Sequence, residues 1–334
     1  MKLTRRETLR TIGAGFGMVG LSSLLASETA VSNVLAPKAP HFPARAKHVI
    51  YLFLNGGPSQ VDTFDPKPLL SKYDSQSIPD SFLQKESRPK DLQNTRLLGS
   101  PWQFRKYGQS GLEVSDLFPH LGGMADDLCV IRSMHTDLPA HPQAITQMNS
   151  GRLINGFPSM GSWITYGLGT ENQNLPGFIA LCAGLPNVGP DLWSSGFLPA
   201  AFQGTYVPLD ESEPEKMIRH LTNSRITRDG QRRQLDLAQA LNRIDLARRG
   251  QETQLEGRIQ AMETAFHMQV EAMDAFDVAK EPEAVRARYG IPFHHAEIHS
   301  KKRSYTRDGD FARGCLVARR LVERGVRVVQ VYFG

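Results

Sequence analysis

The segment from residue 133 to residue 152 holds the densest set of side chains that could do chemistry. It reads SMHTDLPAHPQAITQMNSGR and places His135, Asp137 and His141 within seven residues. Imidazole and carboxylate groups are common ligands of protein-bound Zn²⁺, and the same groups transfer protons in acid–base catalysis. One histidine alone is more often structural, but two histidines around an aspartate point to a metal or acid–base cluster.

A second polar set follows an apolar run near the start of the chain. The segment NGGPSQVDTFDPKP (55–68) carries Asp62 and Asp65, two carboxylates that could hold a divalent cation. Aspartates in this position also commonly cap turns or helices, and that alternative stays open. If a metal is held here, we expect Asp62 and His141 to approach one another and to share it.

The elements that must position these side chains indicate an α/β fold. The run HVIYLFL (48–54) is apolar on both alternating faces, which is typical of a strand buried between helical layers. Shorter strands are predicted at 128–131 and 178–182, and a longer one at 326–333. Helical spacing over 311–324, then Gly325, predicts a helix that leads into the last strand of a parallel sheet. Ligands of such sheets gather at the carboxyl ends of the strands, where both polar sets are expected.

Three further stretches have a predictable character. A short helix is expected to follow the histidine cluster and to end at Gly151. Residues 231–279 are rich in Leu, Ala, Glu, Gln and Arg, which predicts one long helix or a helical hairpin packed on the outside. Residues 68–118 are expected to form a loop-rich insertion. The three cysteines fall in apolar segments and are interpreted as buried free thiols.

The N-terminus has the pattern of an export signal. Arg5 and Arg6 precede a mildly apolar, Gly-rich stretch and a small-residue end, so residues 1–30 are interpreted as a twin-arginine signal peptide. An ordinary amphipathic helix is the alternative. The twin-arginine translocase is then a partner, and the mature protein is expected in the periplasm or outside the cell. A linker over 31–46 would lead into one domain over 47–334.

Composition excludes several classes of protein. The chain has 39 Lys and Arg residues against 34 Asp and Glu, and this small excess is not gathered into a stripe, which argues against nucleic-acid binding. Only 3 of 334 residues are cysteine, too few for a disulfide scaffold. No uninterrupted apolar run of about 18 residues occurs, so no stable membrane span is expected after signal removal.

Distinctive motifs occupy residues 55–68, 134–152, 158–178, 193–205 and 315–331, in addition to the twin-arginine leader. Together they resemble the DUF1501 family over essentially the whole chain. That family is similar to the alkaline phosphatase–sulfatase superfamily, whose members are αβα sandwiches with metal-dependent hydrolase sites. The resemblance implies an exported hydrolase-like protein acting on small phosphate or sulfate esters. In such a protein, Asp62, Asp137 and His141 are the residues expected to hold a divalent metal, and His135 and His141 are the expected catalytic groups. Zn²⁺ suits this mixed set best, with Mn²⁺ and Ca²⁺ as alternatives.

One departure from the sulfatases bears on mechanism. Ser150-Gly151-Arg152 resembles the end of the sulfatase nucleophile segment, but ten residues before Gly151 stands His141 instead of Cys or Ser. A formylglycine mechanism is therefore not expected. His141 could be a metal ligand, a base for water or a covalent nucleophile, and we favour the first two. A non-catalytic exported binding or scaffold protein is the alternative function.

The end of the chain leads to one more expectation. Residues 331–334 come directly out of the last predicted strand, where a parallel strand normally leads into a loop and a helix. We expect the chain to be a C-terminally incomplete member of its family, with further metal ligands in the missing segment.

Overall fold

The computed structural model describes residues 34–79, 95–172, 174–210, 214–218, 225–249, 253–291 and 308–333. Arg5, Arg6 and the rest of the predicted signal peptide lie outside these residues. None of the helices in the described ranges is long and apolar enough to cross a membrane. The described chain divides into a larger unit, formed by residues up to Asn55 and from Leu138 onward, and a smaller unit over Gly56–Asp137.

The larger unit is built on a four-stranded sheet in which every neighbouring pair is parallel, with the order β1-β6-β4-β5. This confirms the predicted mixed α/β class with a parallel central sheet. The strands are β1 (Val49–Leu54), β4 (Phe178–Ala183), β5 (Thr205–Pro208) and β6 (Val328–Phe333).

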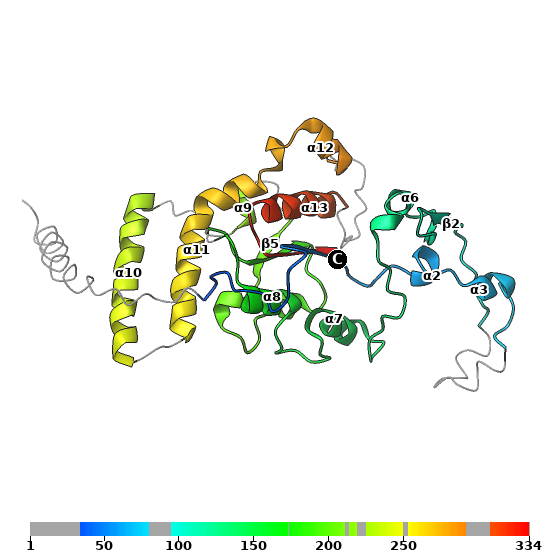
Figure 1. The fold of residues 1–334 in the computed structure, drawn as a ribbon, viewed down its shortest axis with the longest axis horizontal. Coiled ribbons are helices and arrows are strands. Elements are labelled where there is room, and N and C mark those ends of the chain that lie inside the picture. The colour runs from blue at the N-terminus through cyan, green and yellow to red at the C-terminus, as the bar shows by residue number, and fades with distance from the viewer. Residues whose placement is uncertain are drawn as a thin grey trace, which may run out of the picture. The chain divides into compact units, whose positions relative to one another are not determined.

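Helices cover both faces of this sheet (Figure 1). The helices of the larger unit are α7 (His141–Ser150), α8 (Met160–Leu168), α9 (Pro214–Met217), α10 (Arg228–Arg249), α11 (Thr253–Phe276), α12 (Glu283–Arg288) and α13 (Asp308–Glu323). Short 3-10 turns η2 (Gly189–Trp193), η3 (Ala200–Phe202) and η4 (Val278–Lys280) connect them.

Alternation along β6 assigns each side of the sheet to one core. Val329 and Val331 pack with the end of α11 and with α13, whose Leu321 is fully buried. Val328 and Tyr332 point to the other side and pack with Ile145 of α7 and with the turn η2. The side chains of a strand alternate between faces, so a continuous run of apolar residues is what a sheet covered on both sides requires.

The predicted helix before the last strand is confirmed as α13, and Gly325 has the positive φ of 88° expected after its end. The predicted strand at 178–182 is confirmed as β4, which is buried along its whole length. The stretch 231–279 is a pair of helices, α10 and α11, joined by the bidentate ion pair of Arg232 with Glu263 at 2.7 Å.

Two predictions about strands are wrong. No strand forms at 128–131, where Ile131 is 61% exposed. Strand β1 forms as expected, but Ile50, Leu52 and Leu54 on its α13 side are exposed, because β1 is at the edge of the sheet and the described helices cover that face mainly over β6 and β4.

The expectation of three buried thiols holds for Cys182, while Cys315 is half-buried and Cys129 is exposed.

The smaller unit is sparse in regular structure, as expected for a loop-rich insertion. Its sheet is one antiparallel hairpin, and Asp126 fixes the turn of that hairpin by accepting hydrogen bonds from the backbone N–H groups of Gln109 and Ser110. The elements of this unit are α2 (Gln60–Thr63), α3 (Pro68–Lys72), β2 (Phe104–Tyr107), β3 (Leu112–Ser115), α6 (Pro119–Gly122) and η1 (Ala125–Asp127).

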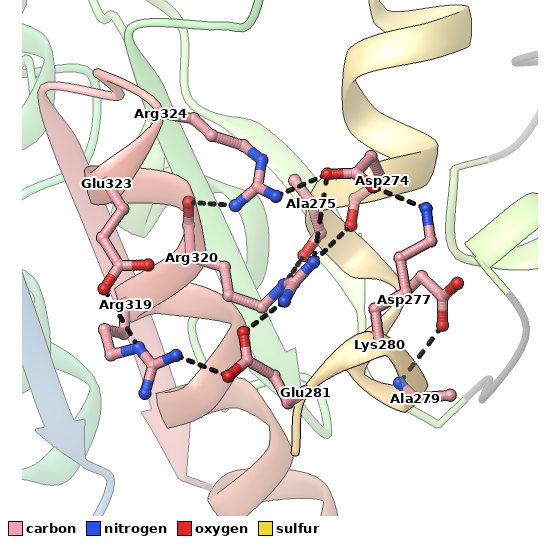
Figure 2. Close-up of polar contacts among 10 residues, drawn as sticks. All are labelled: Asp274, Ala275, Asp277, Ala279, Lys280, Glu281, Arg319, Arg320, Glu323 and Arg324. Atoms are coloured by element: carbon pink, nitrogen blue, oxygen red, sulfur yellow. Dashed lines mark hydrogen bonds and ion pairs between the residues drawn. The ribbon is translucent and has the colours of Figure 1, made fainter. Parts of the chain in front are cut away.

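A network of charged side chains ties the end of α11 to α13 (Figure 2). Arg320 of α13 donates to the carbonyl oxygens of Asp274 and Ala275 at 2.8 and 3.0 Å and pairs with Glu281. Arg324 and Lys280 both bind the carboxylate of Asp274. The last turn of α11 leaves carbonyl groups without helical partners, and Arg320 of α13 satisfies two of them.

This network predicts an acid-sensitive contribution to stability. Hydrogen bonds from Lys280 and then Arg324 lower the pKa of Asp274 to about 2, and Arg319 with Arg320 lowers the pKa of Glu281. A carboxylate whose pKa is lower in the folded than in the unfolded protein stabilises the fold at pH values above its unfolded-state pKa of about 4. This stabilisation is lost as the pH falls through the folded-state pKa. We expect the unfolding free energy to fall between about pH 4.5 and pH 2, and to fall less steeply in Asp274→Asn.

Chemical denaturation at a series of pH values measures this slope. Glu323→Gln is a matched control, because its carboxylate meets Arg319 at 3.2 Å, whereas Asp274 binds both Lys280 and Arg324 at 2.5 Å. An equal acid slope in wild type and in Asp274→Asn would contradict the prediction.

Candidate functional site

His141, the last residue of the predicted histidine cluster, lies in the first turn of helix α7. The helix starts at His141, has Pro142 in the first turn and ends at Gly151, whose φ of 73° is left-handed. Proline fits the first turn because the N–H that it lacks has no helical acceptor there. The helix predicted to end at Gly151 is therefore confirmed, and it places His141 in an exposed position.

A pocket of about 450 Å³ opens beside this first turn. Half of its lining residues carry neutral hydrogen-bonding side chains, namely Gln143, Thr146, Asn155 and Asn187. The apolar part of the lining consists of Pro142, Leu153, Ile154 and Val188. Asn187 and Val188 follow the carboxyl end of β4, which is where ligands of parallel sheets bind. Its volume is in the range of small-molecule sites.

The polar groups of this pocket are held in place by neighbouring side chains. Asn155 donates to the carboxylate of Asp191 at 2.5 Å, and the Thr146 hydroxyl lies 3.4 Å from the Asn155 amide oxygen. Thr146 also donates to the carbonyl of Pro142 at 2.8 Å. An amide whose partners fix its orientation can recognise hydroxyl or ester oxygens without first losing rotational freedom.

Buried polar side chains anchor α7 to the sheet. The Tyr332 hydroxyl lies 2.9 Å from the amide oxygens of Asn149 and Gln330, and all three side chains are buried. Burial raises the pKa of the Tyr332 hydroxyl and of the Cys182 thiol far above neutrality. Both groups therefore stay protonated near pH 7, and neither can serve as an anionic nucleophile.

Asp62 lies in the smaller unit, in the single turn of α2. Its carboxylate accepts hydrogen bonds from the hydroxyls of Ser100 and Ser59, which lower its pKa. No Lys or Arg of the described ranges forms an ion pair with it. Asp65 differs, because Lys67 lies 2.8 Å from its carboxylate and Arg132 lies 4.0 Å from it. Of these two aspartates, Asp62 is therefore the one without an ion pair among the described residues.

His135 and Asp137 lie in the last residues of the smaller unit, and both are exposed. His141 belongs to the larger unit. Within the residues that the structure describes, no three His, Cys, Asp or Glu side chains form a group suited to a metal ion. The expected approach of Asp62 to His141 stays a prediction.

The donor chemistry fits a divalent metal at the level of single residues. An ionised carboxylate held by two hydroxyl groups, as at Asp62, has the charge and the fixed orientation of a metal ligand. Exposed imidazoles, as at His135 and His141, are accessible to an ion from solvent.

The residues of the pocket were not predicted from the sequence. Asn155 and Asn187 are ordinary loop amides, and they meet only because α7 packs against η2. One signal for the pocket was available in the sequence. Gln143 and Thr146 follow Pro142 by one and four residues, so all three lie on neighbouring positions of one face of α7.

Comparison with known proteins gives one match. Residues 46–334 match the family model described as "Protein of unknown function (DUF1501)". Searches of curated proteins and of solved structures found no match.

Proposed function

The chain belongs to the DUF1501 family, and on that premise we propose that it is an exported, metal-dependent hydrolase-like protein of the alkaline phosphatase–sulfatase type. Small phosphate or sulfate esters are the substrate class of this proposal. The observation that carries it is the amide-lined pocket at the first turn of α7, directly after His141 and beyond the carboxyl end of β4. A parallel sheet covered by helices on both faces supports the αβα assignment.

The proposed roles follow from the state of each side chain. Asp62 is ionised and contributes a negative charge, so it is the first proposed metal ligand, and Asp137 and His141 are the other proposed ligands. When bound, a divalent ion such as Zn²⁺, Mn²⁺ or Ca²⁺ would polarise an ester oxygen and lower the pKa of water. Imidazole is a common general acid and base, so His135 and His141 are the proposed catalytic groups. The pocket amides would orient the organic part of the ester.

Metal content is the first test. In the purified mature chain, we expect Asp62→Ala to lower the bound metal several-fold with little change in unfolding free energy, because a half-exposed carboxylate does not fill the core. Elemental analysis after dialysis measures the metal. Asp65→Ala is the matched control, since Lys67 already neutralises that carboxylate.

A panel of phosphate and sulfate esters then separates the two candidate functions. Turnover that is lost with the metal supports the hydrolase. Stoichiometric metal without turnover of any ester would favour a non-catalytic binding protein, and equal metal content in wild type and Asp62→Ala would remove Asp62 from the site. The twin-arginine export of the chain is part of the proposal and rests on Arg5 and Arg6.

A further inference from the structure

A row of aromatic rings runs over the outer side of α8. Phe157, Phe197, Trp163, Tyr166 and Phe202 touch in that order, with ring centroids 5.2 to 6.0 Å apart and planes close to perpendicular. We call these five residues the aromatic row. Three of its members are accessible: Phe197 is 64% exposed, Trp163 44% and Tyr166 42%. Large aromatic side chains that stay this exposed and lie next to one another mark a binding surface.

The row is held in place by the fold beneath it. Trp163 and Tyr166 are three residues apart on α8, so they share one face of the helix. Phe197 reaches them from the turn after η2, and Gly196 lets that turn approach residues 156–158. A Cβ at Gly196 would lie 2.6 Å from the backbone of Phe157 and Pro158, and its φ is 53°. Rings fixed before binding lose little entropy when a ligand arrives.

Two cations stand at the ends of the row. The Arg152 guanidinium lies 5.5 Å from the ring centre of Phe157, and the Lys38 ammonium lies 5.1 Å from that of Tyr166 and 5.6 Å from that of Phe202. In the part of the chain that the structure describes, neither cation forms an ion pair with a carboxylate. A ligand that covers the rings therefore also meets two positive charges, and the complementary ligand is anionic.

The neighbouring pocket indicates what kind of anion fits. Residues 151–157 contribute Phe157 to the aromatic row and Arg152 to its end, and they contribute Leu153, Ile154 and Asn155 to the pocket. The polar lining of that pocket is neutral amides and a hydroxyl, which match the alternating donors and acceptors of sugar hydroxyls. The C–H bonds of a sugar ring are weakly positive and pack against the negative face of an aromatic ring.

From these contacts we infer that the aromatic row binds an acidic oligosaccharide. Its sugar rings lie on Phe197, Trp163 and Tyr166, and its anionic groups face Arg152 and Lys38. This binding does not depend on the proposed hydrolysis, because it uses no metal ligand and no reacting group. An anionic membrane surface is the competing occupant, and the experiment separates the two.

Calorimetric titration of the metal-free protein, kept in EDTA, tests the inference. The probe is trigalacturonate, with its fully methyl-esterified form as the neutral counterpart. We expect trigalacturonate to bind and the ester to bind about ten-fold more weakly. Trp163→Ala and Phe197→Ala should each weaken binding about ten-fold, and Trp163→Phe should restore most of it. Trp102→Ala is the matched control, since Trp102 is 43% exposed but lies in the smaller unit.

Circular dichroism establishes that each variant is folded before its titration is interpreted. Equal binding of both probes would overturn the anionic ligand, and equal binding by wild type and Phe197→Ala would overturn the row as the surface. Cosedimentation with vesicles of an anionic phospholipid, without binding of trigalacturonate, would also overturn it. Loss of turnover in the ester panel leaves the inference standing, because these titrations measure binding without metal.

Discussion

Replacing Arg320 with methionine is expected to lower the free energy of unfolding by about 3 kcal/mol, although the substitution keeps most of the side-chain length. Arg320 is 6% exposed, and it binds Glu281 and the carbonyl oxygens of Asp274 and Ala275. Methionine would leave those two carbonyls without their donors and would take one of two arginines from Glu281. Removing one partner from a buried ion pair costs more than the pair contributes, because the other partner stays desolvated.

Arg319→Met is the matched control for this prediction. Arg319 binds the same carboxylate at 2.7 Å, but it is 32% exposed, so its loss should cost less than about 1 kcal/mol. Urea denaturation of both variants measures the difference. Equal losses in the two variants would show that burial of Arg320 is not what gives the contact its strength.

Gly169→Ala is expected to destabilise the larger unit by about 3 kcal/mol. Gly169 ends α8 with φ 66° and ψ −160°, a conformation that residues with a side chain rarely adopt. A Cβ there would also overlap the carbonyl oxygen of Ala36, and the neighbouring Thr170 N–H donates to the carbonyl of Leu35 at 2.9 Å. Backbone strain and the overlap both oppose the substitution.

Gly167→Ala, two residues earlier, should have the opposite sign. Gly167 is inside α8 and is exposed, and a Cβ added there would have no neighbouring atom within 4 Å. Alanine should stabilise that helix by about 0.5–1 kcal/mol. Thermal and urea unfolding of both variants provide the comparison. A Gly169→Ala variant as stable as wild type would contradict the prediction.

The elements that could be predicted from the sequence are those with a strong local signal. The run at 178–183 is apolar at every position, and the last strand follows a helix and a glycine in order, so β4, α13 and β6 were predictable. The false strand at 128–131 is also apolar at every position, but it has only four residues, and a run that short does not show whether another strand lies beside it. The exposed side of β1 depends on what covers the sheet edge, which is a tertiary property.

The candidate site was predictable in the same uneven way. The sequence predicted a short helix after the histidine cluster, because Gly151 marked its end, and the structure begins that helix at His141 itself. It did not reveal the pocket, since Asn155 and Asn187 come together only through packing of α7 on η2. The aromatic row was also missed, because Phe197 is distant in sequence from Trp163 and Tyr166, and no helical spacing connects them.

The position of β6 between β1 and β4 has a consequence for the order in which the protein is made. Strand β6 is the last of the described strands to leave the ribosome, and it pairs along its whole length with the first strand and with β4. Until residues 328–333 have been synthesised, β1 has no neighbouring strand among the described residues, and one edge of β4 is unpaired. The centre of the sheet therefore forms late and from distant segments, which makes folding slow and leaves nascent chains dependent on protection from association.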